Sequence, residues 1–387
     1  MKGFPSGEVA VVGAYESPRR KAPGVHPYEI QAECVRGALA DAGLTRGDVD
    51  GLCTAATFAH EGGGELEIVD LDEYLGIRPR WFDSTDTGGA AFITHAGHAA
   101  MVIAAGLVDV VVVTYAGAGR SSVMDAPDYN SNTWGPGQFE VPFGPSTVAC
   151  YALAAQRHMH VYGTTPEQLA AIAVQCRANA ASNPNAMYRD PLTVEDVLKS
   201  PMIASPLHKL DCCVISDSGG AFVLASKRRA ARLSRKPVYL LGWGEAIGQT
   251  QMNQMDPFTE TAAKHSGADA FATAGMTPNE IDCAQIYDSF TPTVLLTLES
   301  LGFCGPGEGG AFVESGEIAP SGRLPINTDG GGMSSNHPGR RGALAVVEAV
   351  RQLRGESPGV QLKSPRTCLV NGTGGALSAT ATMILGV

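Results

Sequence analysis

Charged residues are scarce in this sequence, and acidic ones outnumber basic ones. Lys, Arg, Asp and Glu make up 17% of the 387 residues, with 28 basic and 39 acidic side chains and a net charge of −11. A protein that binds a nucleic-acid backbone needs concentrated Lys and Arg, so this balance argues against nucleic-acid binding. The 44% apolar content excludes a disordered segment, because it can supply a substantial core.

Paired cysteine motifs and long apolar runs are also missing. The nine cysteines form no C-x-x-C pair, and their odd number disfavours a disulfide framework, so we expect reduced thiols in a cytoplasmic protein. The longest apolar run, near residues 99–113, is interrupted by Asp109 and falls short of the roughly 20 residues that span a bilayer. The first residues lack the apolar stretch of a signal peptide. We therefore expect neither a membrane protein nor a secreted one.

Short β-branched runs alternate with alanine-rich stretches along the chain. This alternation predicts an α/β protein with a largely parallel sheet, and the length suits two or three packed units. The predicted strands are residues 9–13, 110–115, 221–225, 238–241, 284–287, 368–370 and 380–385. The predicted helices are residues 28–42, 89–105, 165–182, 259–274, 291–301 and 343–353.

One segment of the chain repeats. Residues 38–52 and 270–284 both contain the end of a predicted helix at Ala-Gly, a short turn, and an acidic residue before a strand. Glycine after a last helical residue suits a left-handed C-cap. The repeat predicts two duplicated α/β halves, residues 1–235 and 236–387.

Residues 118–208 interrupt the first half with a stretch rich in Pro, Asn and aromatic residues. It contains one predicted helix and several irregular loops. Loops of this length inside a compact protein are usually functional. We expect an inserted cap over the site, an oligomer contact, or both.

Three separated segments end a predicted strand in a polar or glycine-rich loop. They are Tyr287–Phe290 (YDSF), Asp329–Pro338 (DGGGMSSNHP) and Asn371–Ala376 (NGTGGA). Reactive groups collect at strand ends in α/β sheets, and glycines there allow backbone N–H groups to approach a ligand oxygen. The sequence thus predicts a site with an oxyanion hole, with Tyr287 and His337 as its titratable groups.

These segments together resemble the thiolase superfamily, most closely its sterol-carrier-type branch. Tyr287–Phe290 corresponds to the tetrad of thiolases, which there begins with Asn or His. The His337-Pro-Gly segment corresponds to their His loop, with Asn336 in place of a glycine, and Gly372–Gly375 corresponds to their last glycine turn. The resemblance implies a thiolase fold, in which two duplicated halves form a five-layered αβαβα core with an inserted loop domain.

The thiolase nucleophile is missing. In thiolases a Cys precedes an Asp by about twenty residues, and counting back from Asp109 reaches Gly89. The second thiolase Cys is absent as well, since Asn371 and Ser289 occupy its two usual places. Ser84 or Thr87 is a possible substitute, but a hydroxyl is a poor nucleophile without a dedicated base.

One branch of this superfamily shares the loss of the nucleophile. The chain resembles this branch, the lipid-transfer-protein-like aldolases of steroid side-chain degradation, which keep a Tyr-Asp-x-Phe tetrad. The resemblance implies a CoA-thioester aldolase, a carbon–carbon lyase acting on a bulky β-hydroxyacyl-CoA. Retro-aldol cleavage needs a base and enolate stabilisation but no covalent intermediate. We assign Tyr287 and His337 as the base and the proton donor in either order, and the backbone at Gly89 and Gly374 as oxyanion support.

Several further assignments complete the sequence-based prediction. Asp288, Ser289 and Asn336 are secondary site candidates, and Arg340-Arg341 either binds a CoA phosphate or caps the loop. His95 and His98 lie three residues apart with no evident carboxylate partner, so we predict no metal. Coenzyme A is expected as part of the substrate, with no covalently bound cofactor.

Two other functions stay open at this point. One is a thiolase-type acyltransferase, similar to an acetyl-CoA acetyltransferase, and the other is a non-catalytic acyl-CoA- or lipid-binding subunit. The resemblance also implies a homodimer and a small partner protein with an OB-fold and a zinc ribbon, which together form a heterotetramer.

Overall fold

The computed structural model describes residues 3–56, 67–121 and 134–387. The strands are β1 (Val9–Glu16), β2 (Gly51–Cys53), β3 (Trp81–Asp83), β4 (Val110–Ala118), β5 (Met202–Ala204), β6 (Leu207–His208), β7 (Asp217–Ser226), β8 (Val238–Ile247), β9 (Cys283–Ile286), β10 (Thr367–Gly374) and β11 (Ala379–Gly386). The α-helices are α1 (Pro27–Ala42), α2 (Glu67–Leu75), α3 (Ala91–Ala104), α4 (Thr147–Tyr162), α5 (Pro166–Ala180), α6 (Val194–Lys199), α7 (Lys227–Ala230), α8 (Ala263–Ala274), α9 (Thr291–Ser300), α10 (Gly309–Glu314) and α11 (Gly342–Arg354).

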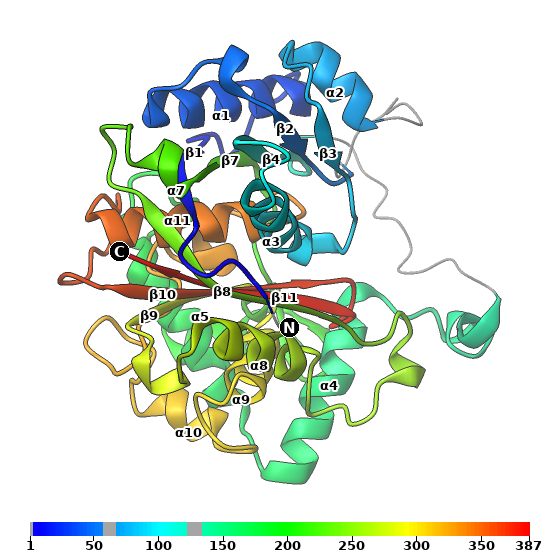
Figure 1. Cartoon of the computed structure of the whole chain (residues 1–387). Helices are drawn as coiled ribbons and strands as arrows, with labels where there is room; N and C mark the ends of the chain where they lie inside the picture. The colour runs from blue at the N-terminus through cyan, green and yellow to red at the C-terminus, as the bar shows by residue number, and fades with distance from the viewer. Residues whose placement is uncertain (1–2, 57–66, 122–133) are drawn as a thin grey trace.

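Five layers stack through the molecule (Figure 1). From top to bottom they are α1 and α2, the first-half strands, the buried helices α3 and α11, the second-half strands, and an outer layer with α8 and α9. Strand alternation explains the stacking, because successive side chains point to opposite faces. On β4, Val111 and Val113 pack toward the middle helices, whereas Val110 and Val112 pack toward α1. The five-layered thiolase fold is therefore confirmed.

The nine strands follow the order β3-β2-β4-β7-β1-β8-β11-β10-β9. Only two residue pairs, Ala10–Tyr239 and Val11–Val238, join β1 to β8. The nine strands therefore form two sheets that touch along one edge. The order β2-β4-β7-β1 in the first half matches β9-β10-β11-β8 in the second.

The repeated segment has the same structure in both halves. Helices α1 and α8 end at Ala42 and Ala274, and the following Gly43 and Gly275 adopt φ values of 70° and 66°. A short 3-10 turn and a strand follow each glycine. The predicted duplication is confirmed, while the domain division at residue 235 stays a prediction.

Two sequence-based expectations were wrong. The sheet is mixed, because β1–β7, β4–β7, β10–β11, β8–β11 and β1–β8 are antiparallel and only β2–β3, β2–β4 and β9–β10 are parallel. The alternation of strands and helices did not show that β7 runs antiparallel to β4 and that β11 runs antiparallel to β10. The insertion also holds α4 and α6 besides the predicted helix, and Ser146 and Thr193 cap these two helices. None of the helices in the described residues has the length and apolar character needed to cross a bilayer.

An ion cluster around His98 connects the two halves. Its Nδ1 lies 2.7 Å from Asp83 Oδ2 on β3, and its Nε2 lies 3.4 Å from Glu245 Oε1 on β8. The carboxylate partners that the sequence did not reveal therefore exist, and they come from distant strands. Hydrogen bonds to Asp83 and Glu245 raise the pKa of His98 to about 9, so the imidazole is charged at neutral pH.

We expect His98→Gln to lower stability in a pH-dependent way. Because the folded pKa is raised above the unfolded value of 6.5, the contribution is complete below pH 6.5 and is lost as the pH rises through 9. The variant should lose roughly 1–2 kcal/mol at pH 6 and little at pH 10. Urea unfolding at both pH values measures the difference, with His160→Gln on the exposed face of α4 as control. An equal loss at both pH values would refute the ionic role.

Candidate active site

A tyrosine and a histidine from separate loops form the centre of the site. Tyr287 follows β9 directly, and its backbone N–H donates to the Asn371 carbonyl at 3.0 Å. Its hydroxyl lies 2.8 Å from Nε2 of His337, and the two rings meet edge to face. The structure thus brings together the two residues that the sequence singled out. Their catalytic roles stay a proposal, because geometry alone does not demonstrate turnover.

The loop before His337 is shaped by a buried carboxylate. Asp288 Oδ1 accepts the N–H of Gly332 at 2.7 Å, and Oδ2 accepts the N–H of Met333 at 3.1 Å. The loop forms a π-helical turn over Gly331–Ser335, and the His337 N–H then donates to Ser216 Oγ at 2.9 Å. Asp288 therefore positions the loop and, through it, the imidazole.

An ion network lies beneath the same loop. The Arg341 side chain is 1% exposed and pairs with Asp329 at 2.6 Å, and it also donates to Asn336. Asn336 in turn donates to Glu16 on β1. Burial prevents Arg341 from binding a CoA phosphate, so it caps the loop. The sequence placed Asp329 at the start of the loop but did not reveal its ion pair with Arg341. It gave no sign of Glu16, because Glu16 and Asn336 lie 320 residues apart in the chain.

Burial keeps the pair uncharged at neutral pH. The pKa of His337 falls to about 4, first because burial disfavours the charged imidazole and then because the Arg341 charge repels a proton. Burial likewise raises the pKa of Tyr287 well above 10, and the backbone N–H of Arg341 opposes that rise only in part. The resting pair is therefore a neutral phenol beside a neutral imidazole, which allows a proton to pass between them.

Two helices begin at the phenol. Arg341 is the N-cap residue of α11, and the 3-10 turn Gly88–Ala90 leads into α3. The N-terminal ends of helices carry partial positive charge and free N–H groups, which stabilise anions. The N-terminal ends of α3 and α11 therefore stabilise an anion that forms beside Tyr287.

Gly89 leaves no room for a side chain. A Cβ at this position would lie 2.2 Å from Tyr287 Cε2 and 2.5 Å from the Thr373 carbonyl oxygen. At Gly374, a Cβ would lie 1.8 Å from the carbonyl oxygen of Thr87. The tyrosine ring thus fills the space in which a nucleophilic side chain at position 89 would stand. Whether the N–H groups of Gly89 and Gly374 hold an oxyanion stays a prediction.

Among the residues that the structure describes, we find no replacement nucleophile. All nine cysteines are free, and in the described chain no cysteine sulfur is hydrogen-bonded to His337. Burial raises the pKa values of Cys176 and Cys213 well above 9, so both remain thiols. The buried Thr87 hydroxyl has no hydrogen-bond partner, and Ser289 Oγ contacts Thr293 Oγ1 at 3.0 Å. The Cys176 thiol contacts the carboxylate of Asp288 at 3.7 Å, but among the hydrogen bonds of the described residues none joins these groups to His337.

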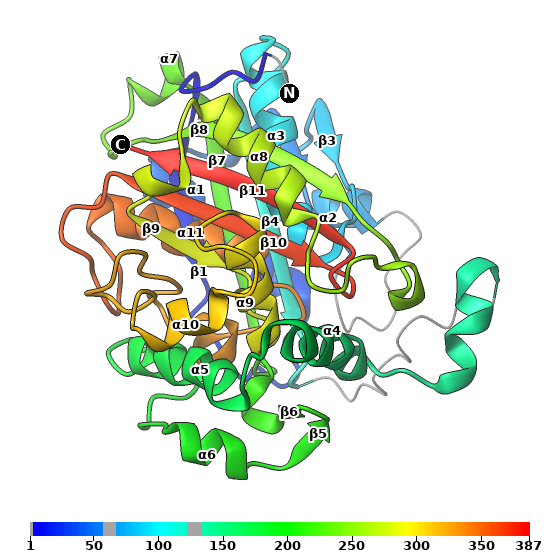
Figure 2. The ribbon, with the colours of Figure 1, turned by 90° about the horizontal axis from the view of Figure 1, so that it is seen from below.

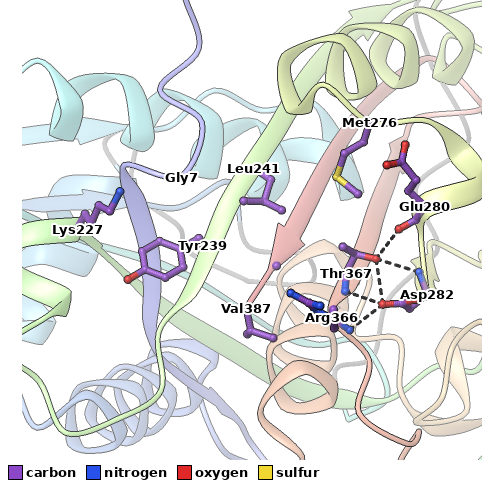
Figure 3. A pocket seen from close by; sticks show the side chains of 11 residues that line it. Gly7, Lys227, Tyr239, Leu241, Met276, Glu280, Asp282, Arg366, Thr367 and Val387 are labelled. Atoms are coloured by element: carbon purple, nitrogen blue, oxygen red, sulfur yellow. Dashed lines mark hydrogen bonds between the residues drawn. The ribbon is translucent and has the colours of Figure 1, made fainter.

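A large cavity lies at a distance from this chemistry. It measures about 790 Å³ and lies where β9 and β10 begin and β11 ends, the edge of the second sheet opposite Tyr287 (Figure 3). Two of the charged groups on its wall already have partners. Lys227 pairs with Glu8 at 3.2 Å, and Asp282 accepts the N–H groups of Arg366 and Thr367. We therefore place the active site at the Tyr287–His337 pair and not in this cavity.

Fold and site together define a thiolase-like protein without a nucleophilic thiol. The C-terminal residues 244–387 match the family model "Thiolase C-terminal domain-like". The chain is 37% identical to the 17-hydroxy-3-oxo-4-pregnene-20-carboxyl-CoA lyase of Mycobacterium tuberculosis, over 91% of this chain and 93% of that protein. It is 35% identical to the steroid side-chain-cleaving aldolase of Thermomonospora curvata, over 91% of each chain.

A solved structure agrees with these relatives. The structure named "Ltp2-ChsH2(DUF35) aldolase" superposes with a TM-score of 0.88 at 34% identity, covering 100% of this chain and 99% of that one. The chain belongs to the thiolase superfamily, in the branch of the steroid side-chain aldolases. This confirms the resemblance seen in the sequence and the expectation of a carbon–carbon lyase.

Proposed function

We propose that this protein cleaves a bulky β-hydroxyacyl-CoA by a retro-aldol reaction, with Tyr287 and His337 as the proton-transfer pair. The observation that carries the proposal is the 2.8 Å contact between these two side chains at the N-terminal ends of two helices. The names of the lyase and aldolase relatives support a CoA thioester with a steroid- or lipid-type acyl group. Coenzyme A then enters as part of the substrate.

In the first step, the Tyr287 oxygen accepts the proton of the substrate's β-hydroxyl group as its own proton passes to Nε2 of His337. The bond between the α- and β-carbons breaks, and the β-carbon becomes the carbonyl carbon of a ketone. The bonding electrons move to the α-carbon and form a thioester enolate. The proton returns from the pair to the α-carbon, so a shorter acyl-CoA and a ketone result with no net gain or loss of protons.

Enolate stabilisation accounts for much of the expected rate. Backbone N–H groups near Gly89 and Gly374 and the N-terminus of α11 are the donors we assign, and one well-placed donor is worth about 3 kcal/mol. Asp288 contributes indirectly, because it holds the loop that carries His337. Ser289 and Asn336 are bonded to other groups, so we give them no part in proton transfer.

The acyltransferase alternative is disfavoured by the packing around Gly89. Acyl transfer of the thiolase type needs a thiolate at the start of α3, and the Tyr287 ring occupies that space. The non-catalytic alternative is disfavoured by the pair itself, since a binding scaffold has no need of a phenol–imidazole contact at two helix ends.

We also propose a homodimer that works with a small OB-fold, zinc-ribbon partner in a heterotetramer. The name of the superposed structure includes a second component, ChsH2(DUF35), which supports a partner subunit. A cap role for residues 118–208 fits the contacts of α5 with the His337 loop, where Arg177 donates to Ser334 at 2.9 Å. A cytoplasmic location stays a prediction.

Alkylation of the thiols should leave turnover intact. We expect the iodoacetamide-treated native protein to keep at least about half of its cleavage rate, because no step of the proposed reaction uses sulfur. Mass spectrometry during turnover should detect no acyl-enzyme. A thiolase of known nucleophile, treated in parallel, serves as control. Loss of turnover together with an acylated cysteine would contradict the aldolase assignment.

A further inference from the structure

A second cavity lies over the ends of β2 and β3 in the first half. It measures about 380 Å³, within the usual range for a small-molecule site. Its walls are residues 54–56 after β2, residues 67–69 at the start of α2, and Phe82, Ser84 and Asp86 around the end of β3. Because β2 and β3 are parallel, their carboxyl ends share the sheet edge from which the chain enters α3 (Figures 1 and 2).

Asp86 connects this cavity to the catalytic pair. Its two carboxylate oxygens accept bonds from Arg340 at 2.7 and 2.9 Å, and Oδ1 also accepts the N–H of Gly88 at 2.9 Å. Arg340 follows His337 by three residues, and its positive charge interacts electrostatically with the phenols of Tyr287 and Tyr115. One ion pair therefore separates the inner end of the cavity from the reacting groups.

The chemistry of the walls favours an uncharged ligand. The ionisable groups that line it, Glu67 and Asp86, are both acidic, and the described lining contains no Lys or Arg. Phosphate groups of a nucleotide would be repelled there. Ala55, Ile68, Val69 and Phe82 supply apolar surface, and Phe82 is 61% and Val69 45% exposed, which is costly unless something covers them.

We propose that this cavity binds the apolar, uncharged body of the acyl group, the part that leaves as the ketone. The inference rests on the proposed retro-aldol function and adds the place of substrate selection to it. The CoA end of the substrate then lies on the other side of the Asp86–Arg340 pair. Residues that narrow the cavity set which ring systems or branched chains are accepted.

The test is the binding of a four-ring steroid 17-ketone to the native protein, measured by equilibrium dialysis. Val69→Trp places an indole at the mouth of the cavity and should weaken ketone binding by about tenfold or more, equivalent to about 1.4 kcal/mol. Leu107→Trp is the matched control, because Leu107 is 65% exposed in the turn after α3 and lies outside the cavity. Coenzyme A binding, measured in the same way, should be unchanged in both variants.

A second pair of variants keeps the test decisive if the indole disturbs folding. Phe82→Glu should also weaken ketone binding, while Ile247→Glu, at an 82% exposed position at the end of β8, should not. Equal ketone affinity in wild type, Val69→Trp and Phe82→Glu would overturn the assignment, as would a matching loss of coenzyme A binding. Absence of cleavage by the wild type, with ketone binding still sensitive to Val69→Trp, would instead reject the proposed reaction alone.

Discussion

Replacing Tyr287 by phenylalanine is expected to lower kcat/KM for cleavage by about 10²–10⁴-fold, the usual worth of a positioned acid or base. The change removes one oxygen atom and leaves the ring that fills the space beside Gly89. His337→Ala removes the other partner of the 2.8 Å contact and should have an effect of the same order. Because the two side chains act as a unit, the double variant should be hardly worse than either single variant.

The measurement is a coupled assay of ketone release with a β-hydroxyacyl-CoA substrate. Tyr239→Phe is the control, because Tyr239 lines the distant large cavity. Thermal midpoints of all variants check that folding is unchanged. Losses that multiply in the double variant would show that the two residues act in separate steps. Full activity of Tyr287→Phe would end the proposal.

Gly89→Cys, which restores the residue type of a thiolase nucleophile, is expected to abolish the aldolase without creating a thiolase. The new Cβ would lie 2.2 Å from the Tyr287 ring, so the ring must move and the contact with His337 must lengthen. We expect a loss of more than about 100-fold in kcat/KM and about 1–3 kcal/mol of stability, as for other overpacked cores.

A second substitution distinguishes the effect of Gly89→Cys on packing from its effect on catalysis. Tyr287→Asn in the Gly89→Cys background removes the clash with the ring but not the 2.5 Å approach to the Thr373 carbonyl oxygen, so it should restore part of the lost thermal stability and none of the cleavage. Gly47→Cys is the control, because the nearest atom outside its chain neighbours to a Cβ there is 3.8 Å away. A Gly89→Cys protein that keeps wild-type turnover and stability would show that the ring is not confined as described.

The sequence was sufficient to predict local features of the fold and the site. It did not predict the side-chain pairs that form between separate elements. Tyr287 was found because it follows a strand directly, His337 because it lies in a glycine-rich His-Pro loop, and Gly374 because a strand ends there in a glycine turn. The duplicated Ala-Gly helix end revealed the two halves. The pairs Asp86–Arg340 and Asp329–Arg341 join separate elements, and side chains brought together only by folding leave no local pattern.

The wrong expectation of a parallel sheet has the same origin. Strand β7 returns beside β4 only after the long insertion, and β11 turns back tightly on β10, so connection length alone did not give strand direction. Helix α4 was missed although Ser146 before it and Gly163 after it are ordinary cap signals. Of the two alternatives left open for Arg340-Arg341, a phosphate ligand or a loop cap, the structure supports the loop cap for Arg341, whose burial the sequence did not reveal.

The crowding at position 89 also constrains the order of evolutionary change. A thiolate side chain at the start of α3 and a phenol at position 287 exclude each other in this packing. A chain with glycine at position 89 and a smaller residue at position 287 avoids the clash and can be reached from either arrangement by one substitution. Such a chain has neither reacting group in place, so we expect it to bind acyl thioesters without turning them over.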